Sequence, residues 1–397
     1  MMIDLEINKF FTLTVIGGGL TGQLMVSLLL KNKFINPDQL CWINLNAKKS
    51  KDTRVSFLNT KNFHQLRYNF KYHFNDNDFL NIHQIMVHNE NEKSPLSLED
   101  NHGHGVIIQN DILKKNFKIS KKILNVFTSK VINTKHDQFH RYLSLENGTV
   151  IKTSLVISAD GNSSSLRDFA NIKYISQNLN HTIISGYLYS KKFDNIIARQ
   201  VFLNDSFIGL LPVSKSNNLV NFVWSLDNKV LENRKSNFNY HDEIVKRLNS
   251  FFLKYKIDFE HRNANIKEYD KLQIYSSYVK FVNNPFSKRI VLIGDAAHTI
   301  HPLAGQGFNL SIEDCFDLLK CINKASAYGK DLGDVSVLKE YNNFRKKRKN
   351  LITLITTTIF YLFKQRSKNL NSLINLVTQN INKTSTKKIF TILARGY

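Results

Sequence analysis

A short stretch near residue 300 combines a carboxylate with several glycines, which suits it to holding a ligand. Residues 289–293 are apolar and partly β-branched, and they predict a buried strand. Gly294 and Asp295 follow at its carboxyl end, where α/β folds place ligand contacts. Residues 309–319 predict a helix that starts at Asn309, and a helix N-terminus favours negative charge. The loop between them contains Pro302, Gly305, Gln306 and Gly307. Glycine lets the backbone approach a planar ligand because no Cβ intervenes.

A second glycine cluster lies close to the N-terminus, between an expected strand and an expected helix. Residues 12–16 are apolar and β-branched, and residues 24–30 form an apolar run. Between them, Gly17, Gly19 and Gly22 fit the G-x-G-x-x-G spacing, with Leu20 and Thr21 inside it. The first glycine allows a tight turn, the second lets pyrophosphate reach the backbone, and the third lets helix pack on strand. This context predicts a dinucleotide site.

One residue expected of such a site is absent. A second strand, predicted over residues 40–45, should end in an Asp or Glu that binds the ribose hydroxyls, about 20 residues after the glycines. The chain has Asn44 and Asn46 there. The amide oxygen of Asn44 accepts a hydrogen bond but carries no charge, so we expect a weaker site rather than a lost one.

A third segment repeats the strand–turn–helix pattern in the middle of the chain. Residues 155–157 predict an apolar strand, and Asp160 and Gly161 follow it. Residues 163–165 are serines and Arg167 comes next, as at the start of a helix. An ordinary Asp-Gly turn explains the same residues, so this segment alone leaves both interpretations open.

Together the three segments resemble the fingerprints of the FAD-dependent aromatic hydroxylases of the para-hydroxybenzoate hydroxylase type. The chain is most similar to the ubiquinone-biosynthesis hydroxylases in that family. The resemblance covers most of residues 10–365 and includes G-D-A-A-H, H-P and G-Q-G-x-N. Further matching elements are Asp52, Arg54 and Leu58, residues 105–113, 207–212 and 223–225, and the set Leu338, Tyr341 and Arg345. The chain departs from the family pattern at Asn44, at Ser311 in place of glycine, and at Phe57 in place of a small residue. These departures put full activity in question.

The resemblance implies an α/β fold. We expect an FAD-binding Rossmann-like domain of the glutathione-reductase type, interleaved with a mixed β-sheet substrate domain and followed by C-terminal helices. A hairpin over residues 142–151, turning at Asn147 and Gly148, and strands over residues 183–189, 207–213 and 219–224 predict that second domain. The expected FAD-binding parts are 1–80, 111–175 and 281–345, the substrate parts are 81–110 and 176–280, and the helical region is 346–397.

The resemblance also implies an activity. A monooxygenase of this type uses FAD, a transient NADPH or NADH donor and O2. Through a flavin C4a-hydroperoxide it hydroxylates the ring of an aromatic substrate, here a polyprenyl phenol of ubiquinone biosynthesis. By this resemblance the glycines of the first motif hold pyrophosphate, Asp295 binds the ribitol or pyrophosphate side, residues 302–307 border the isoalloxazine ring, and Arg54 lies near the cofactor. No catalytic acid or base can be named from the sequence. A hydroxylase of another aromatic substrate and a drifted flavin-fold scaffold of a biosynthetic complex remain as alternatives.

Composition narrows the partners and the location. The 397 residues hold 55 Lys and Arg against 32 Asp and Glu, a net charge of +23. No nucleic-acid motif accompanies this charge, which leaves a solvated basic surface or attraction to anionic lipid headgroups. Three cysteines predict no disulfide framework. His298 and His301 lack a third ligand, so we expect no metal.

The ends of the sequence bear on location. We find no signal-peptide pattern, and the apolar run at residues 351–363 is shorter than the ~20 residues that span a bilayer. It follows five basic residues at 345–349. We therefore expect a cytoplasmic protein, and this region either lies at the inner face of the membrane or packs on the body of the protein.

Overall fold

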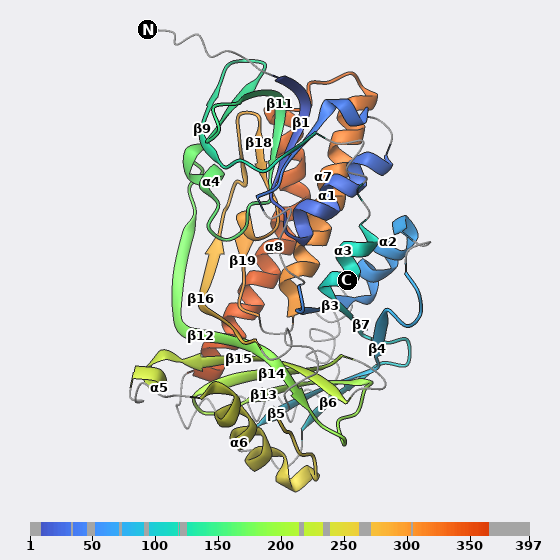
Figure 1. Ribbon diagram of the computed structural model, residues 1–397, viewed down its shortest axis with the longest axis vertical. Coiled ribbons are helices and arrows are strands. Elements are labelled where there is room, and N and C mark those ends of the chain that lie inside the picture. Colours follow the sequence, from blue (N-terminus) through green and yellow to red (C-terminus); the bar gives the residue numbers. More distant parts are fainter. Residues whose placement is uncertain are drawn as a thin grey trace.

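The computed structural model describes residues 9–32, 35–45, 52–70, 74–90, 95–117, 119, 125–213, 218–232, 239–261, 271–302 and 305–364. Asn46 lies outside these ranges. Within them the chain forms two large sheets and one small sheet, with helices packed around them (Figure 1). The alternation of parallel strands and helices in the first sheet, beside a largely antiparallel second sheet, confirms the α/β fold expected from the sequence.

The first sheet carries the three glycine-containing segments. Its strand order is β17-β18-β11-β1-β2-β8, and β18, β11, β1, β2 and β8 run parallel. Strands β10 and β9 extend it from β11 as an antiparallel branch. The bounds are β1 (Lys9–Ile16), β2 (Leu40–Ile43), β8 (Asn125–Phe127), β9 (Val131–His136), β10 (Arg141–Leu145), β11 (Val150–Ser158), β17 (Phe286–Ser287) and β18 (Ile290–Leu292).

The hairpin expected over residues 142–151 is confirmed, and its strands lie in the first sheet rather than the second. Strands β10 and β11 pair antiparallel around Asn147 and Gly148, and both belong to the first sheet. Strand β11 continues without a break to Ser158, so the hairpin strand and the strand before Asp160 are one element. The sequence did not show this because polar Lys152, Thr153 and Ser154 interrupt the apolar pattern.

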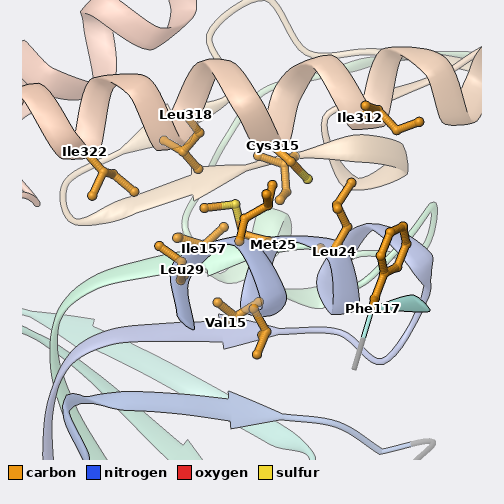
Figure 2. Close-up of a cluster of buried hydrophobic side chains, with 14 of the residues drawn as sticks. Val15, Leu24, Met25, Leu29, Phe117, Ile157, Ile312, Cys315, Leu318 and Ile322 are labelled. Carbon is orange, nitrogen blue, oxygen red and sulfur yellow. The ribbon is translucent and has the colours of Figure 1, made fainter. Parts of the chain in front are cut away.

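Helices α1 (Leu20–Lys31) and α7 (Gln306–Ala327) stack on one face of the first sheet. Figure 2 shows α1 between the sheet and α7, with Leu24 and Met25 pointing into the layer formed with Cys315 and Leu318. Helix α1 is apolar on nearly all sides because the sheet covers one side of it and α7 covers the other. Helix α8 (Val335–Lys364) packs against α7 in turn. This stacking fixes the N-termini of α1 and α7 relative to the strand ends.

The second sheet has the order β19-β16-β12-β15-β14-β13-β5-β6. One of its faces packs on α6 (Tyr240–Phe252) through buried residues such as Trp224 and Phe252. In Figure 1, β12 and β16 are long strands of the second sheet that extend up towards the first sheet. The bounds are β5 (Gln84–Asn89), β6 (Leu96–Glu99), β12 (Ile175–Tyr189), β13 (Ile197–Phe202), β14 (Ser206–Pro212), β15 (Leu219–Asp227), β16 (Gln273–Phe281) and β19 (His298–Thr299). The strands expected at 183–189, 207–213 and 219–224 are therefore confirmed.

The small third sheet has the order β3-β7-β4 and contacts α7. Its strands are β3 (Val55–Asn59), β4 (Phe79–Ile82) and β7 (Gly105–Gln109). The remaining helices are α2 (Thr60–Phe70), α3 (Asn110–Asn116), α4 (Ser165–Phe169) and α5 (Asn228–Glu232), with 3₁₀ turns at Pro37–Gln39, Leu253–Tyr255 and Gly294–Ala296.

Candidate cofactor and active site

The candidate site is built on the carboxyl ends of the parallel strands, which all meet at one edge of the first sheet. Main-chain hydrogen bonds continue past the strands and tie the following residues to one another. These bonds are Gly17 N to Ile43 O (2.9 Å), Ala159 N to Ile16 O (2.7 Å) and Ile293 N to Ser158 O (2.9 Å). The segments at Gly17, Asp160 and Gly294 are thereby held side by side, at the edge where doubly wound sheets bind ligands.

Close backbone contacts explain two of the glycines. Gly17 has φ +125°, and a Cβ on it would lie 2.1 Å from the carbonyl oxygen of Ala159. A Cβ on Gly22 would lie 2.1 Å from the carbonyl oxygen of Gly17. Any side chain at either position would push the first motif away from Asp160 or push α1 away from β1. The structure thus brings the Gly17 motif and the Asp160 segment into direct contact.

The segment at Gly294 also lies in close contact with the Gly17 motif. Gly294 has φ +60°, and a Cβ on it would lie 2.9 Å from the side-chain oxygen of Thr21 and 3.1 Å from that of Ser311. Leu20 and Thr21 form the first turn of α1, so the start of α1 faces the turn after β18. Ser311 stands where the family usually has glycine, and its hydroxyl donates to the carbonyl of Gly307 one turn earlier in α7 (3.2 Å).

Two helix N-termini at this edge have backbone N–H groups that no side chain caps. The N-cap residues are Gly19 for α1 and Gly305 for α7, and neither first turn contains an acid. A Cβ built on Gly19, Gly161 or Gly307 would meet no described atom within 4 Å, so open space adjoins the backbone there. Uncapped helix ends beside open backbone are suited to a phosphate-bearing ligand. These residues fit the pyrophosphate of FAD.

Asn44 lies where the sequence placed it, directly after β2 and beside the glycine loop. Its backbone N–H donates to Phe127 O (2.8 Å), and its residue is buried. Its side-chain Oδ1 lies 1.8 Å from the point that a Cβ on Gly18 would occupy. The amide therefore packs on the backbone of the first motif, near the position at which a ribose acid is expected.

Arg54 precedes β3 and is held by Asp52. Its Nε and Nη2 donate to the two oxygens of Asp52 (2.8 and 2.9 Å), and Lys114 pairs with the same carboxylate (2.9 Å). Burial alone would raise the pKa of Asp52, but hydrogen bonds and charge from Arg54 and Lys114 hold it below its usual range. The side chain of Arg54 is 56% exposed, so a fixed cation faces accessible space.

The charges of Asp295 and Tyr275 lie near enough to Arg54 to influence it. The hydrogen bond to Asp52 raises the pKa of Arg54 most, and the charges of Tyr275 and Asp295 add to it. Surrounding protein raises the pKa of Asp295 by desolvation, against the influence of His298 and Arg54. Desolvation likewise raises the pKa of Tyr275, although its side chain is 49% exposed. Arg54, Asp295 and Tyr275 are thus close enough to affect one another's ionisation. Sequence reasoning missed Tyr275, which comes from β16 of the second sheet.

The loop before α7 closes on β3. Gly305 N donates to Pro302 O (3.1 Å), and a Cβ on Gly305 would lie 3.2 Å from Cβ of Phe57. Phe57, which the family usually replaces with a small residue, therefore packs directly on this glycine. Gln306 is buried at the first position of α7.

The side chain of Asn309 is engaged by the protein. Its Nδ2 donates to Phe57 O (2.8 Å), and its Oδ1 accepts from Asn59 N (2.9 Å) and Asn62 Nδ2 (3.0 Å). It joins α7 to β3 and α2. A cofactor contact at Asn309, which stays a prediction, would have to use the backbone.

Asp160 holds its own turn. Its Oδ1 accepts from Ser158 Oγ (2.6 Å), and its Oδ2 accepts from Leu166 N at the start of α4 (3.4 Å). Gly161 follows with φ +87°. Arg167 ties this turn to the next segment, because it donates to Asn162 O and Ala296 O. The Asp160 turn thus has a definite place beside the Asp295 turn.

Comparison with known proteins agrees with this geometry. Residues 127–354, more than half of the chain, match the family model described as FAD binding domain. The chain belongs to this FAD-binding family.

Known relatives and structures extend the comparison. The chain is 29% identical over 249 residues to the ubiquinone biosynthesis monooxygenase COQ6, mitochondrial, of Rattus norvegicus, covering 56% of this chain and 52% of the relative. It is 27% identical to the protein of that name from Homo sapiens, covering 65% and 63%. The matched stretch thus spans about half to three fifths of these relatives. The crystal structure of p-nitrophenol 4-monooxygenase PnpA from Pseudomonas putida DLL-E4 shares the fold, with a TM-score of 0.74 at 14% identity over 98% of this chain and 99% of that one.

A buried carboxylate that sequence reasoning missed anchors the turn at Gly294 after β18. Asp314 of α7 is 1% exposed; its Oδ2 accepts from Gly294 N (2.9 Å) and lies 2.6 Å from His298 Nε2. Its Oδ1 accepts from Arg345 Nε of α8 (2.7 Å). Burial would raise the pKa of Asp314, but His298 and Arg345 keep it below its ordinary value. The available signal was the pair of acids Glu313 and Asp314 within the buried stretch of α7.

The two histidines of this region serve different neighbours. His298 contacts Asp314, whereas His301 Nε2 lies 3.0 Å from Ser225 Oγ of β15. Burial lowers the pKa of His301 to about 3, so its ring is neutral near pH 7. No group of three or more metal-ligating side chains occurs among the described residues.

Proposed function

We propose that this chain is an FAD-dependent monooxygenase that hydroxylates the aromatic ring of a polyprenyl phenol in ubiquinone biosynthesis. The donor would be NADPH or NADH and the oxidant O2. The observation that carries the proposal is the meeting of Arg54, Asp295 and Tyr275 at the edge of the FAD-binding sheet, with Tyr275 supplied by the second sheet. The name of the curated relatives supports the ubiquinone assignment.

The residues of this chain would bind and orient the cofactor. The uncapped N-termini of α1 and α7 would hold its phosphates, and the amide of Asn44 would bind the ribose. Bound FAD supplies the electron transfer and the activation of O2. Arg54 and Asp295 would fix opposite charges beside the ring, and Pro302 and Gly305 would border it.

The second sheet would provide the substrate surface. Ile184, Ile208 and Trp224 point to the α6 side, so their strand neighbours point to the opposite face. On that face Ser185, Val223 and Gly209 lie in one row of paired residues. A Cβ on Gly209 would meet nothing closer than 3.6 Å. A row of small side chains would leave room for an aromatic ring, and the sheet would shield that side of the ring from water.

The first experiment is the visible absorption spectrum of the purified protein, with FAD released and quantified. One FAD per chain, NADPH or NADH oxidation and O2 uptake with a polyprenyl phenol are the expected results. Asp295→Ala should lower hydroxylated product relative to hydrogen peroxide. The matched control is Asp258→Asn, an exposed acid far from the site, which should behave as the wild type. A colourless protein that takes up no added FAD would favour a scaffold role.

The pathway assignment is tested in the organism that encodes the chain. Deleting the gene should lower ubiquinone and accumulate a precursor that lacks one ring hydroxyl. A flavin-containing protein whose deletion leaves the quinone profile unchanged would instead be a hydroxylase of another aromatic substrate.

We also propose that the protein works in the cytoplasm at the inner membrane face, since a polyprenyl substrate partitions into lipid. None of the described helices has the length and hydropathy to cross a bilayer. Two of the five basic residues at 345–349, Arg345 and Lys349, are buried, so that run is a smaller surface feature than the sequence indicates. The outward side instead shows Phe344, Leu351 and Leu354, which are 46%, 45% and 66% exposed.

That arrangement fits interfacial contact by apolar side chains with flanking lysines. Flotation with vesicles rich in anionic lipid should recover the wild type. A Leu351→Ser, Leu354→Ser variant should float less, while the control Leu253→Ser, which alters a 77% exposed leucine elsewhere, should not. Equal flotation of all three proteins would exclude this surface.

A further inference from the structure

Arg199 lies on β13, away from the FAD-binding edge, on the side of the second sheet that α6 covers. In the register of the sheet it pairs with Met86 of β5, and His88 of β5 pairs with Val201. Val201 belongs to the core under α6, so Arg199, Met86 and His88 share that side. Figure 1 shows β13, β5 and α6 at the end of the molecule opposite β1 and β18.

The guanidinium of Arg199 has only neutral, weak acceptors. Its Nη1 lies 2.8 Å from Sδ of Met86 and 3.4 Å from Nε2 of His88. Its Nε is buried and has no hydrogen-bond partner. The residue is 8% exposed and makes no ion pair within the described part of the chain. Burial lowers the pKa of Arg199, against the opposing influence of the charges of Asp194 and Tyr255.

The other buried arginines in the described ranges all donate to oxygen. Arg141 donates to Thr134 Oγ1 and a backbone carbonyl, and Arg167 donates to two carbonyls. Arg289 and Arg345 bind carboxylates. Arg199 therefore differs from its counterparts in having no oxygen partner. A buried charge without hydrogen-bonded compensation is costly to the fold, and such costs are retained where a ligand supplies the missing partner.

The surroundings of Arg199 are cationic and aromatic. Lys254 is close enough that it and Arg199 help burial to lower the pKa of His88 to about 3, which leaves that ring neutral. The ring of Phe193 lies 5.5 Å from the guanidinium carbon, and the rings of His88 and Tyr255 are 5.3 Å apart. Two positive charges beside aromatic rings favour a small organic ligand that carries a negatively charged group.

We propose that Arg199 and Lys254 form a second ligand site, which binds the oxyanion of a small molecule, a carboxylate or a phosphate group. The planar guanidinium offers paired donors that match either group, and Lys254 adds a mobile charge at the rim. Neither the buried Nε of Arg199 nor the neutral ring of His88 binds an anion of the described part of the protein that would compete with the ligand. The site is separate from the FAD-binding edge and does not depend on the proposed hydroxylase activity.

The test is thermal unfolding of the full chain at constant ionic strength, with chloride replaced stepwise by inorganic phosphate or by acetate. Wild type should show a saturable rise in the unfolding midpoint, about 2 °C at ten times the dissociation constant. Arg199→Met should abolish that rise and Lys254→Ala should reduce it. Arg141→Met is the matched control: it should lower the starting midpoint because Thr134 loses a donor, yet keep the full rise.

The arms of the experiment separate the ligand classes. A rise with phosphate alone assigns a phosphate group, and a rise with acetate alone assigns a carboxylate. Since general salt effects act on every variant equally, only the difference between wild type and Arg199→Met counts. Equal responses of wild type, Arg199→Met and Lys254→Ala to both anions would overturn the proposal. Lys254 is exposed, so its variant folds even if Arg199→Met does not.

Discussion

Replacing Arg345 by methionine tests whether α8 holds the FAD-binding loop in place. The guanidinium of Arg345 lies between α8 and α7, with its side chain 3% exposed. It donates to Asp314 (2.7 Å), Glu313 (2.7 Å), Asp317 (3.2 Å) and the carbonyl of Leu310 (3.1 Å). Methionine fills similar space but removes every one of these donors.

The loss of stability in Arg345→Met follows from the carboxylates that it leaves buried. Asp314 and Glu313 are 1% and 7% exposed at the side chain, so both stay buried without their main cation. Removing one partner of a buried ion pair costs about 3–5 kcal/mol. Asp317 is 35% exposed and adds little, since solvent screens it. We expect Arg345→Met to lower the free energy of unfolding by about 3–5 kcal/mol, a large part of a typical total.

The loss should be pH-dependent. Asp314 has a pKa below its ordinary value in the folded chain, so its pairing stabilises the fold above the unfolded pKa of about 4 and is lost as pH falls further. Without Arg345 that pKa rises, so the variant should begin to lose stability at a higher pH than the wild type.

Urea unfolding from pH 4 to 8, with FAD titration by fluorescence in parallel, measures both effects. FAD affinity should fall because Asp314 also accepts from Gly294 N. The control is Lys324→Met. It removes the exposed ion pair between Lys324 and Glu340, whose length (2.8 Å) is similar, and should change neither the stability nor the FAD affinity noticeably. A change in the Arg345 variant as small as in the control, at every pH, would refute the account of α8 as the anchor.

Other substitutions test single contacts. Lys349 is buried and its Nζ donates to Val282 O, and burial lowers its pKa to about 8. The free energy of unfolding of the wild type should therefore rise with pH between about 8 and 10.5. Lys349→Met should remove up to ~3 kcal/mol of that rise in urea unfolding. Asn44→Glu should tighten FAD binding several-fold in a fluorescence titration, and an unchanged dissociation constant would show that Asn44 does not face the ribose. Gly17→Ala should abolish FAD binding, since its Cβ would lie 2.1 Å from Ala159 O; retained yellow colour would contradict that geometry.

The parts of the site that the sequence revealed are those set by local backbone demands. Gly17 and Gly22 are required by contacts with neighbouring backbone, and the spacing of such contacts along one strand–turn–helix unit is regular. Apolar runs likewise predicted β1, β2 and β18 of the first sheet to within a few residues, because strands buried on both faces are continuously apolar. Strand β12 extends eight residues before the expected start at Ile183, since its first part is polar and exposed.

Pairings between distant segments were beyond sequence reasoning. Tyr275 comes near Arg54 and Asp295 from β16 of the second sheet, and no local pattern marks that proximity. The basic run that contains Arg345 and Lys349 indicated a charged surface. The helical phase of α8 turns these two inward instead, onto acids of α7 and onto a carbonyl. Amphipathicity alone does not reveal this, because buried charges look the same as exposed ones in a sequence.

Asp314 joins two events that the sequence presents as separate, the docking of α8 and the shaping of the FAD-binding loop. One of its oxygens holds Gly294 N and the other holds Arg345. Any ligand that requires Gly294 in its present position therefore favours the docked α8, and docked α8 favours that ligand by the same free energy. Bound FAD should then stabilise a helix that it does not contact, and loss of α8 should weaken FAD binding even though every glycine of the three motifs is intact.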